Sequence, residues 1–544
     1  MDTGPTSILS RRRLLGATAV AGLGAATGCS TPLTPGPPAP SATSDASAGR
    51  PNHVAFAGIQ PDIPAANPNA IDGYLAFPTD RTSILPEKLN LTEPIACLAP
   101  LSIFTPPPMA SNAFWQNLNE QLGITLDITM VPGADYTNQF QARIAAGDIP
   151  EVVRIPSVPK LDDLLEARFS DLSEHLSGEA VTDYPMLANF SSTTWDAALF
   201  DGAVRGVPMP LLPIANRLEA RMDIIESLGQ SIDFSSVEDF LSFCRAVTDP
   251  KADRYAMVSP YPSNFTRQIC GVPNTWAEEG GRFTHDVETE QYKQWLDLVR
   301  RMWAEGMFHP QALANPQVAL LFQSGQFLLF EVGGAGFTSA MPVYTKAAPG
   351  LRVAPVVPPL YAGGGKAPVY LGRGSNGLTA IRKDVAPARV KELLSVLNAM
   401  AAPFGTKEWL HVQFGKEGTD FTWVEGKGPQ LTETGTKEKI VANYLPGSPM
   451  VMFAPGYEDT VKAECDYEAR VGATALPLPT NGLYSAEDSS AGAQLNVKIM
   501  NATLDVITGR TTVSGWDGIV QEWRSGGGDA IRAEYQDAFA ARHG

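Results

Sequence analysis

The stretch that decides the fold is residues 118–150, which read LNEQLGITLDITMVPGADYTNQFQARIAAGDIP. Leucines at positions 118 and 122 continue a four-residue spacing that starts at Phe114, which predicts a helix ended by Gly123. Apolar and polar side chains then alternate from Ile124 to Met130, which predicts a half-buried strand. The stretch therefore begins as a helix followed by a strand.

A second helix is expected after the turn at Pro132, with Asp135 as its cap and Gly147 at its end. Its apolar face carries Tyr136, Phe140 and Ile144. Strands are expected on both sides of the stretch, over residues 95–104 and 151–155. Strands and helices that alternate at these spacings predict a parallel α/β sheet.

The later segments are mostly helical. Helices are expected from the capping box at Ser235 and Ser236 onward, and over residues 289–305, 384–401 and 516–541. An apolar strand is expected over residues 327–332, and the chain contains no internal repeat.

The amino terminus carries an export signal. Residues 10–29 read SRRRLLGATAVAGLGAATGC, in which three arginines precede an apolar run that is too short to span a bilayer. The arginines resemble a twin-arginine (Tat) signal, and ATGC resembles a bacterial lipobox, which implies cleavage after residue 28 and lipidation of Cys29. A plain secretory signal with an incidental cysteine is the alternative. Residues 29–50 are rich in Pro, Ser and Ala and predict a tether.

The composition limits the classes of function. The chain has 544 residues, of which 44% are hydrophobic, and a formal net charge of −17. The length allows two or three domains, and the negative charge disfavours nucleic acid as a partner. The cysteines at 97, 244, 270 and 465 show neither a C-x-x-C pair nor clustered histidines, so no zinc site is expected. Cys244 and Cys270 either form a disulfide after export or remain buried thiols.

Several blocks carry a family resemblance. Besides residues 118–150, they are Asp201-Gly202 with RGVP at 205–208, RMD at 221–223, FQSGQ at 322–326, GKEGTDF at 415–421 and Trp516-Asp517. In this order the chain resembles the extracellular solute-binding proteins of bacterial ABC importers, family 1, in their large, lipid-anchored, carbohydrate-associated branch.

Large members of this family often carry a calcium loop. The corresponding loop here, DPKADRY at 249–255, lacks the central glycine and the oxygen ligands of that loop, so no metal is expected.

The resemblance implies an α/β, two-lobe periplasmic-binding-protein fold (type II-like), with hinge-linked lobes and a helical C-terminal part. The expected segments are the signal peptide 1–28, the tether 29–50, an irregular extension 51–92 on lobe 1, lobe 1 at 93–213, lobe 2 at 214–368, a return to lobe 1 at 369–384 and helical segments 385–544 that complete both lobes.

The resemblance also implies a mode of action. A small solute, most simply an oligosaccharide or sugar derivative, binds between the lobes and is delivered to the membrane subunits of an ABC permease. Neither catalysis nor a cofactor is needed. The mature protein is expected to be a monomer that Cys29 anchors by lipid to the extracytoplasmic face of the cell membrane.

Sugar sites need aromatic rings for stacking and planar polar groups for hydroxyls. The loops that the resemblance places at the cleft provide ten candidates: Asn112, Trp115, Arg217, Arg221, Trp276, Glu331, Phe337, Arg373, Asn376 and Trp423. Some have simpler interpretations, since Trp115 suits core packing and Arg221 could pair with Asp223 or Glu226 on the helix surface.

Two other functions remain open from the sequence. The solute could be a peptide or a signalling molecule instead of a sugar. The protein could also be an exported carbohydrate-active enzyme, which would need two carboxylates across a cleft. However, the sequence shows no G-x-S-x-G, H-E-x-x-H or phosphate-loop motif.

Overall fold

The computed structural model describes residues 49–543 except 102–104, 215, 262, 315–317, 334–340 and 342–343. These residues belong to one of the two compact units of the chain, Ala46–Gly544, which is described here by itself. The predicted signal peptide, the lipidation site Cys29, almost all of the tether and the candidate Phe337 lie outside the described residues. No helix in the described ranges is long and apolar enough to cross a membrane.

The first sheet, which defines lobe 1, has five strands in the order β3-β2-β4-β14-β7. Its strands are β2 (Ile95–Leu101), β3 (Leu126–Pro132), β4 (Val152–Arg154), β7 (Val207–Pro210) and β14 (Ser375–Ile381). The predicted parallel sheet is confirmed in its first three strands, because β2 pairs in parallel with both β3 and β4. Strand β14 runs antiparallel to β4 and β7.

Helices α1 and α2 form where the periodicity predicts them. Helix α1 (Ala113–Leu122) ends at Gly123, whose φ of 69° is a left-handed conformation that suits glycine. Helix α2 (Gly133–Ala146) ends at Gly147 in the same way. The expected cap at Asp135 was wrong, because the helix begins two residues earlier and Asp135 lies in its first turn.

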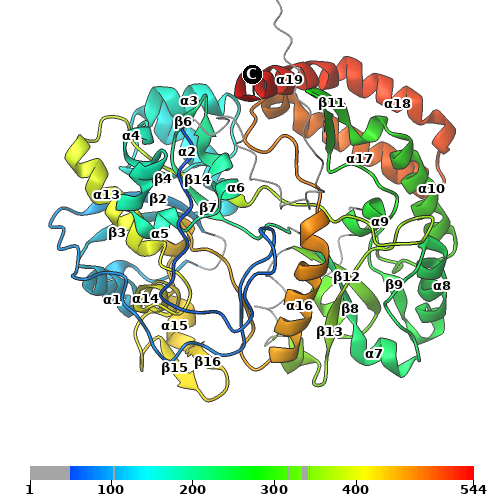
Figure 1. Cartoon of the computed structure of the whole chain (residues 1–544), viewed down its shortest axis with the longest axis horizontal. Helices are drawn as coiled ribbons and strands as arrows, with labels where there is room; N and C mark the ends of the chain where they lie inside the picture. Colours follow the sequence, from blue (N-terminus) through cyan, green and yellow to red (C-terminus); the bar gives the residue numbers. More distant parts are fainter. Residues whose placement is uncertain are drawn as a thin grey trace, which may run out of the picture. The chain divides into compact units, whose positions relative to one another are not determined.

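The lobe 1 core contains residues from two parts of the chain, one that precedes lobe 2 and one that follows it. Leu98 and Val153 of the sheet pack with Phe114 of α1 and with Leu393 and Leu397 of a later helix. The later helices of this lobe, drawn in yellow in Figure 1, are α13 (Pro387–Met400), α14 (Lys407–Phe414) and α15 (Glu433–Glu438).

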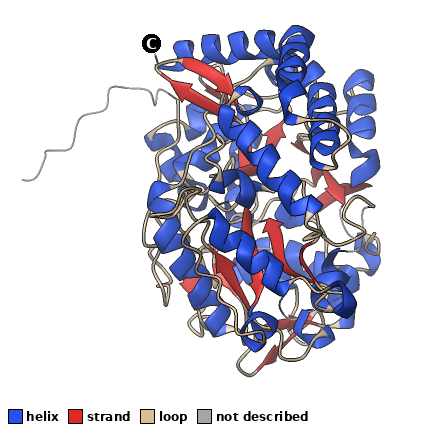
Figure 2. Cartoon of the chain, turned by 90° about the vertical axis from the view of Figure 1, so that its right-hand side faces the viewer, coloured by secondary structure: helices blue, strands red, loops and turns tan. Residues whose placement is uncertain are grey.

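The second sheet defines lobe 2 and has the order β13-β8-β12-β9. Its strands are β8 (Asn216–Arg221), β9 (Tyr255–Met257), β12 (Phe327–Gly333) and β13 (Val353–Val356). Leu218 and Leu329 of this sheet pack with Phe240, Trp295 and Trp516. These come from α8 (Val237–Val247), α10 (Glu290–Ala304) and α18 (Trp516–Trp523), and α17 (Ala493–Ile507) joins the same core. Figure 2 shows the strands in red among the enclosing blue helices.

The expected helix over residues 516–541 is divided. A π-helical turn at Arg524–Gly528 separates α18 from α19 (Asp529–His543), and Gly527 within it has a φ of 132°. Only glycine adopts that conformation without strain, so the chain bends there.

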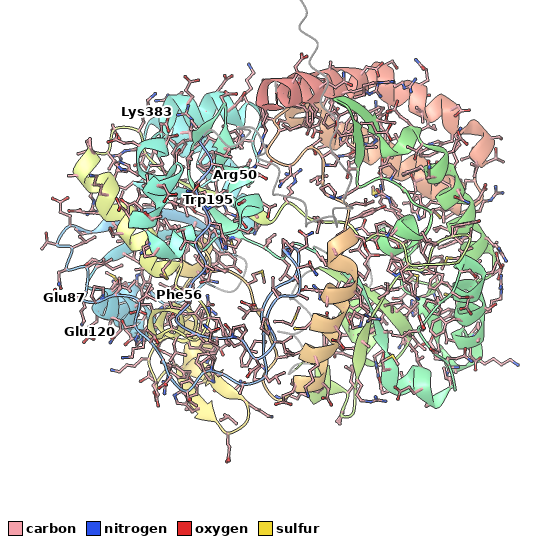
Figure 3. All side chains as sticks on the ribbon, viewed as in Figure 1. Arg50, Phe56, Glu87, Glu120, Trp195 and Lys383 are labelled. Carbon is pink, nitrogen blue, oxygen red and sulfur yellow. The ribbon has the colours of Figure 1, made fainter. Side chains whose placement is uncertain are left out.

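Phe56, which precedes lobe 1 in the chain and is labelled in Figure 3, packs against the lobe 1 core. The segment that contains it, residues 51–92, also reaches α16 (Glu458–Val471), because the backbone N–H of Ile71 donates to Glu468 at 2.9 Å. Helix α16 lies against β13 of lobe 2.

Three chain segments cross between the lobes side by side. The N–H of Leu211 donates to Gly374 O at 2.9 Å, and the N–H of Gly372 donates to Pro213 O at 2.8 Å. The N–H of Leu371 donates to Leu476 O at 2.8 Å. We call these three segments, around residues 211–214, 369–374 and 476, the hinge.

The four cysteines of the described part are buried free thiols. Cys244 and Cys270 therefore do not form the disulfide that the sequence left open.

Candidate ligand-binding site

Two cavities adjoin each other beside the hinge. The larger has a volume of about 910 Å³ and the smaller about 440 Å³. Arg373, Thr480, Asp488 and Tyr535 line both, so the two volumes share a boundary. We call them the lobe 1 cavity and the lobe 2 cavity, after the sheet and helices that supply most of each wall.

The lobe 1 cavity lies at the carboxyl ends of parallel strands. Leu101 ends β2 and Arg154 ends β4, and both line it together with Gly133 at the start of α2. This edge of an open α/β sheet is where such folds bind ligands, because the loops there diverge and leave a crevice.

An aromatic wall lines the lobe 2 cavity. Trp276 begins the hairpin of β10 (Trp276–Glu279) and β11 (Arg282–His285), while Trp523 ends α18 and Tyr535 lies on α19. The ring centre of Trp276 lies 5.8 Å from that of Tyr535 and 6.0 Å from that of Trp523. Tyr370 from the hinge adds a fourth ring.

His285 supports this wall as a neutral side chain. Its ring stands perpendicular to that of Trp276, at 4.7 Å between centres. Burial, together with Arg267 and Arg532, lowers the pKa of His285 to about 3. The imidazole is therefore uncharged at neutral pH.

Carboxamides face the aromatic wall. Asn216, Asn264, Gln268 and Asn496 line the lobe 2 cavity, and none of their side chains makes a hydrogen bond with another described residue. A fifth amide, Asn274, donates to Leu371 O at 2.8 Å and so ties the cavity wall to the hinge. Four amides thus remain available to bridge pairs of hydroxyl groups on a ligand.

Three of the ten predicted residues line these cavities. Trp276 lies in the lobe 2 cavity, Asn376 in the lobe 1 cavity and Arg373 in both. They come from β10, β14 and the hinge, which the fold brings together beside the crossing segments.

Three other predicted residues lie in lobe 1, away from both cavities. Asn112 is buried and caps α1 by accepting from the N–H of Trp115, whose own indole N–H donates to Leu126 O at 3.0 Å. Trp423 packs against Phe77 at 5.4 Å between ring centres and lines a separate cavity of about 300 Å³.

The remaining three have partners within lobe 2. Buried Arg217 forms ion pairs with Glu464 and Glu468 of α16. Arg221 pairs with Asp223 at 2.8 Å.

Glu331 accepts from the N–H of Asn264 at 2.8 Å. It therefore holds the start of α9 (Asn264–Ile269), the helix that carries two of the cavity amides, while burial raises its pKa. None of these three side chains lines either cavity.

Sequence reasoning missed most of the cavity wall. Asn264 and Gln268 are four residues apart and so share a helix face, a signal that was available. Trp523 and Tyr535 gave no signal, because aromatic residues on helices usually belong to the core.

Residues 113–413 match the family model described as bacterial extracellular solute-binding protein. The chain is similar to the polygalacturonan/rhamnogalacturonan-binding protein YtcQ of Bacillus subtilis, with 24% identity over 76% of this chain and 85% of that protein. It is also similar to lipoprotein LipO of the same organism, with 20% identity over 82% of this chain and 92% of that one.

A solved structure shares the fold. It is an HMO-binding, ABC-transporter-associated solute-binding protein from Bifidobacterium longum infantis, with a TM-score of 0.61 and 13% identity. The match covers 82% of this chain and 98% of that one. The two-lobe α/β architecture expected from the sequence is therefore confirmed.

Proposed function

The chain belongs to the bacterial extracellular solute-binding proteins, and we propose that its solute is an oligosaccharide held in the two adjoining cavities. YtcQ, which is named as a polygalacturonan/rhamnogalacturonan-binding protein, supports this class of solute. We further propose that the loaded protein delivers the sugar to the membrane subunits of an ABC permease. The relative that is associated with an ABC transporter supports that partner.

The observation that carries the proposal is the composition of the lobe 2 cavity. Sugar rings present flat C–H faces that stack on aromatic rings, and Trp276, Trp523 and Tyr535 offer such faces. Sugar hydroxyls both donate and accept, as carboxamides do, and four amides there have no internal partner.

Binding alone is sufficient for this role. The ligand is gripped between the lobes, and the hinge lets one lobe rotate toward the other until the cavities close over the sugar. No bond in the ligand is made or broken, so the protein acts without catalysis.

We also propose that the protein works as a monomer on the extracytoplasmic face of the membrane, held by a lipid on Cys29. The lipoprotein LipO supports the anchor. A tethered binding protein stays at a high effective concentration near its permease.

Thermal shift and titration calorimetry with neutral and acidic oligosaccharides and with a peptide panel test the proposal. We expect at least one oligosaccharide to raise the Tm by mass action and to bind with a stoichiometry of one. Binding of peptides with no response to any sugar, or conversion of the sugar to shorter products, would contradict it.

A further inference from the structure

Arg154 is a buried cation without a counterion. It ends β4, lines the lobe 1 cavity and is only 6% exposed. Among the described residues, no carboxylate lies within 4.0 Å of its nitrogens, and its Nη1 has no hydrogen-bond partner. The contact of Nη2 with the sulfur of Met209, at 4.0 Å, is weak. A buried guanidinium without an anion is costly, so its retention points to an anion that arrives from outside.

Gly377 packs closely against the guanidinium. This glycine also lines the lobe 1 cavity, and a Cβ atom placed on it would lie 3.1 Å from Nη1 of Arg154. A side chain at position 377 would crowd both terminal nitrogens, which a carboxylate contacts together in the bidentate geometry that arginine favours.

The charges around this cavity favour an anion, although the chain as a whole carries −17. Arg154 and Arg373 line it as cations, and Asp196 and Asp488 as anions. The negative charge of Asp196 is already offset by two arginines. One of its oxygens pairs with both Arg50, labelled in Figure 3, and Arg542. Asp488 accepts from the hydroxyl of Tyr535 at 2.7 Å.

The start of α2 adds partial positive charge to the same wall. Helix α2 has 14 residues, and Gly133, its first residue, lines the cavity. The residue before it is Pro132, whose side chain cannot cap the helix, and the acidic side chain in its first turn, Asp135, makes no capping hydrogen bond.

From this geometry we infer that the oligosaccharide is acidic, and that a carboxylate of one of its sugar residues binds Arg154 in the lobe 1 cavity while its other rings stack in the lobe 2 cavity. This inference rests on the proposed function and specifies its ligand as a uronic acid-containing chain. The carboxylate replaces the missing counterion, so binding converts an unfavourable buried charge into a charge-assisted hydrogen-bonded pair.

The test uses the mature protein and three related probes: trigalacturonate, its methyl ester and neutral galactotriose. Two variants accompany the wild type. Arg154→Met removes the buried cation. Arg143→Met removes a cation from the last turn of α2, where Arg143 pairs with Asp148 at 2.7 Å away from both cavities.

We expect trigalacturonate to bind the wild type about tenfold to a hundredfold more tightly than its methyl ester. Arg154→Met should abolish this preference, whereas Arg143→Met should keep it. The Tm of ligand-free Arg154→Met should equal or exceed that of the wild type, because an unpaired buried charge is removed.

Equal affinity of the wild type for the acid and its ester would overturn the inference, and this comparison needs no variant. An undiminished preference in Arg154→Met would also overturn it. If galactotriose binds and trigalacturonate does not, the inference fails while the proposed function stands. If no oligosaccharide of the wider panel binds, the proposed function itself fails.

Discussion

At the scale of single residues, the lobe 2 sheet contains a carboxyl group whose pKa is raised by its burial. Glu219 lies on β8, the strand paired on both sides, and is fully buried; within the described part of the chain, neither of its oxygens meets the distance and angle limits of a hydrogen bond. Burial and the neighbouring charge of Glu464 raise the pKa of Glu219 well above its ordinary value of 4.5, although Arg217 lowers it. The folded protein therefore retains a proton here that the unfolded chain releases.

The raised pKa makes stability fall as pH rises. From about pH 4.5 upward the unfolded chain loses the proton first, so the free energy of unfolding decreases until the folded pKa is reached. Glu219→Gln, which stays neutral, should flatten this fall and raise the Tm at pH 8. The measurement is the Tm from pH 5 to pH 9.

The control is Glu120→Gln, an exposed position labelled in Figure 3. It should leave the pH profile as in the wild type. A steeper fall in Glu219→Gln than in the wild type would contradict a protonated Glu219.

Trp276 is the residue that the proposed sugar site depends on most. Trp276→Ala should raise the Kd of a bound oligosaccharide by about thirtyfold, because roughly 2 kcal/mol of ring burial is lost. Trp276→Phe should restore much of the affinity. Trp303→Ala, on the same lobe but outside both cavities, serves as the control in calorimetry. Equal Kd values for Trp276→Ala and Trp303→Ala would show that the aromatic wall does not contribute to sugar binding.

At the scale of elements, α16 joins the lobe 2 sheet to the extension before lobe 1. Its Glu464 and Glu468 pair with Arg217 of β8, and Glu468 also accepts from the N–H of Ile71. The side chains of all three charged residues are at most 1% exposed. This buried triad fixes the register of α16 against the sheet.

Arg217→Met should therefore be severely destabilising. It leaves two buried carboxylates without their cation, at a cost of about 3–5 kcal/mol. Arg245→Met breaks a half-exposed pair with Glu305 and should cost less than about 1 kcal/mol. Urea unfolding of both variants measures the difference. If Arg217→Met were as stable as Arg245→Met, the triad would have no structural role.

The local elements could be predicted from the sequence because their signals are local. Gly123 and Gly147 end their helices where the helical periodicity of apolar residues stops. Strand β3 follows the alternation of apolar and polar residues. The site could not be predicted to the same degree. Trp276 meets Trp523 and Tyr535 only through tertiary packing. Arg217 forms an internal ion pair with Glu464, and the sequence could not indicate this pair because the two residues lie far apart along the chain.

At the scale of the whole molecule, the proposed function requires a change of shape in the described unit. The lobes are joined by three hydrogen-bonded crossing segments, and Leu371, Gly372 and Arg373 of the hinge line the lobe 2 cavity. A ligand that fills the cavity therefore touches the segments about which the lobes would rotate. Under the proposed function, closure would bury the sugar and present a distinct surface to a permease.

Small-angle scattering should register that closure. With a saturating oligosaccharide, we expect a smaller radius of gyration than for the ligand-free protein, and no such decrease for Trp276→Ala at the same concentration. A scattering profile that does not change on saturation would rule out the hinge mechanism.

Native mass spectrometry tests the central claim most directly. The mature protein is incubated with an equimolar mixture of trigalacturonate, its methyl ester, galactotriose and a peptide of similar mass. We expect a single adduct of one intact oligosaccharide per chain, lost in Trp276→Ala. A spectrum that holds only the peptide adduct, no adduct, or shortened sugars would contradict the account.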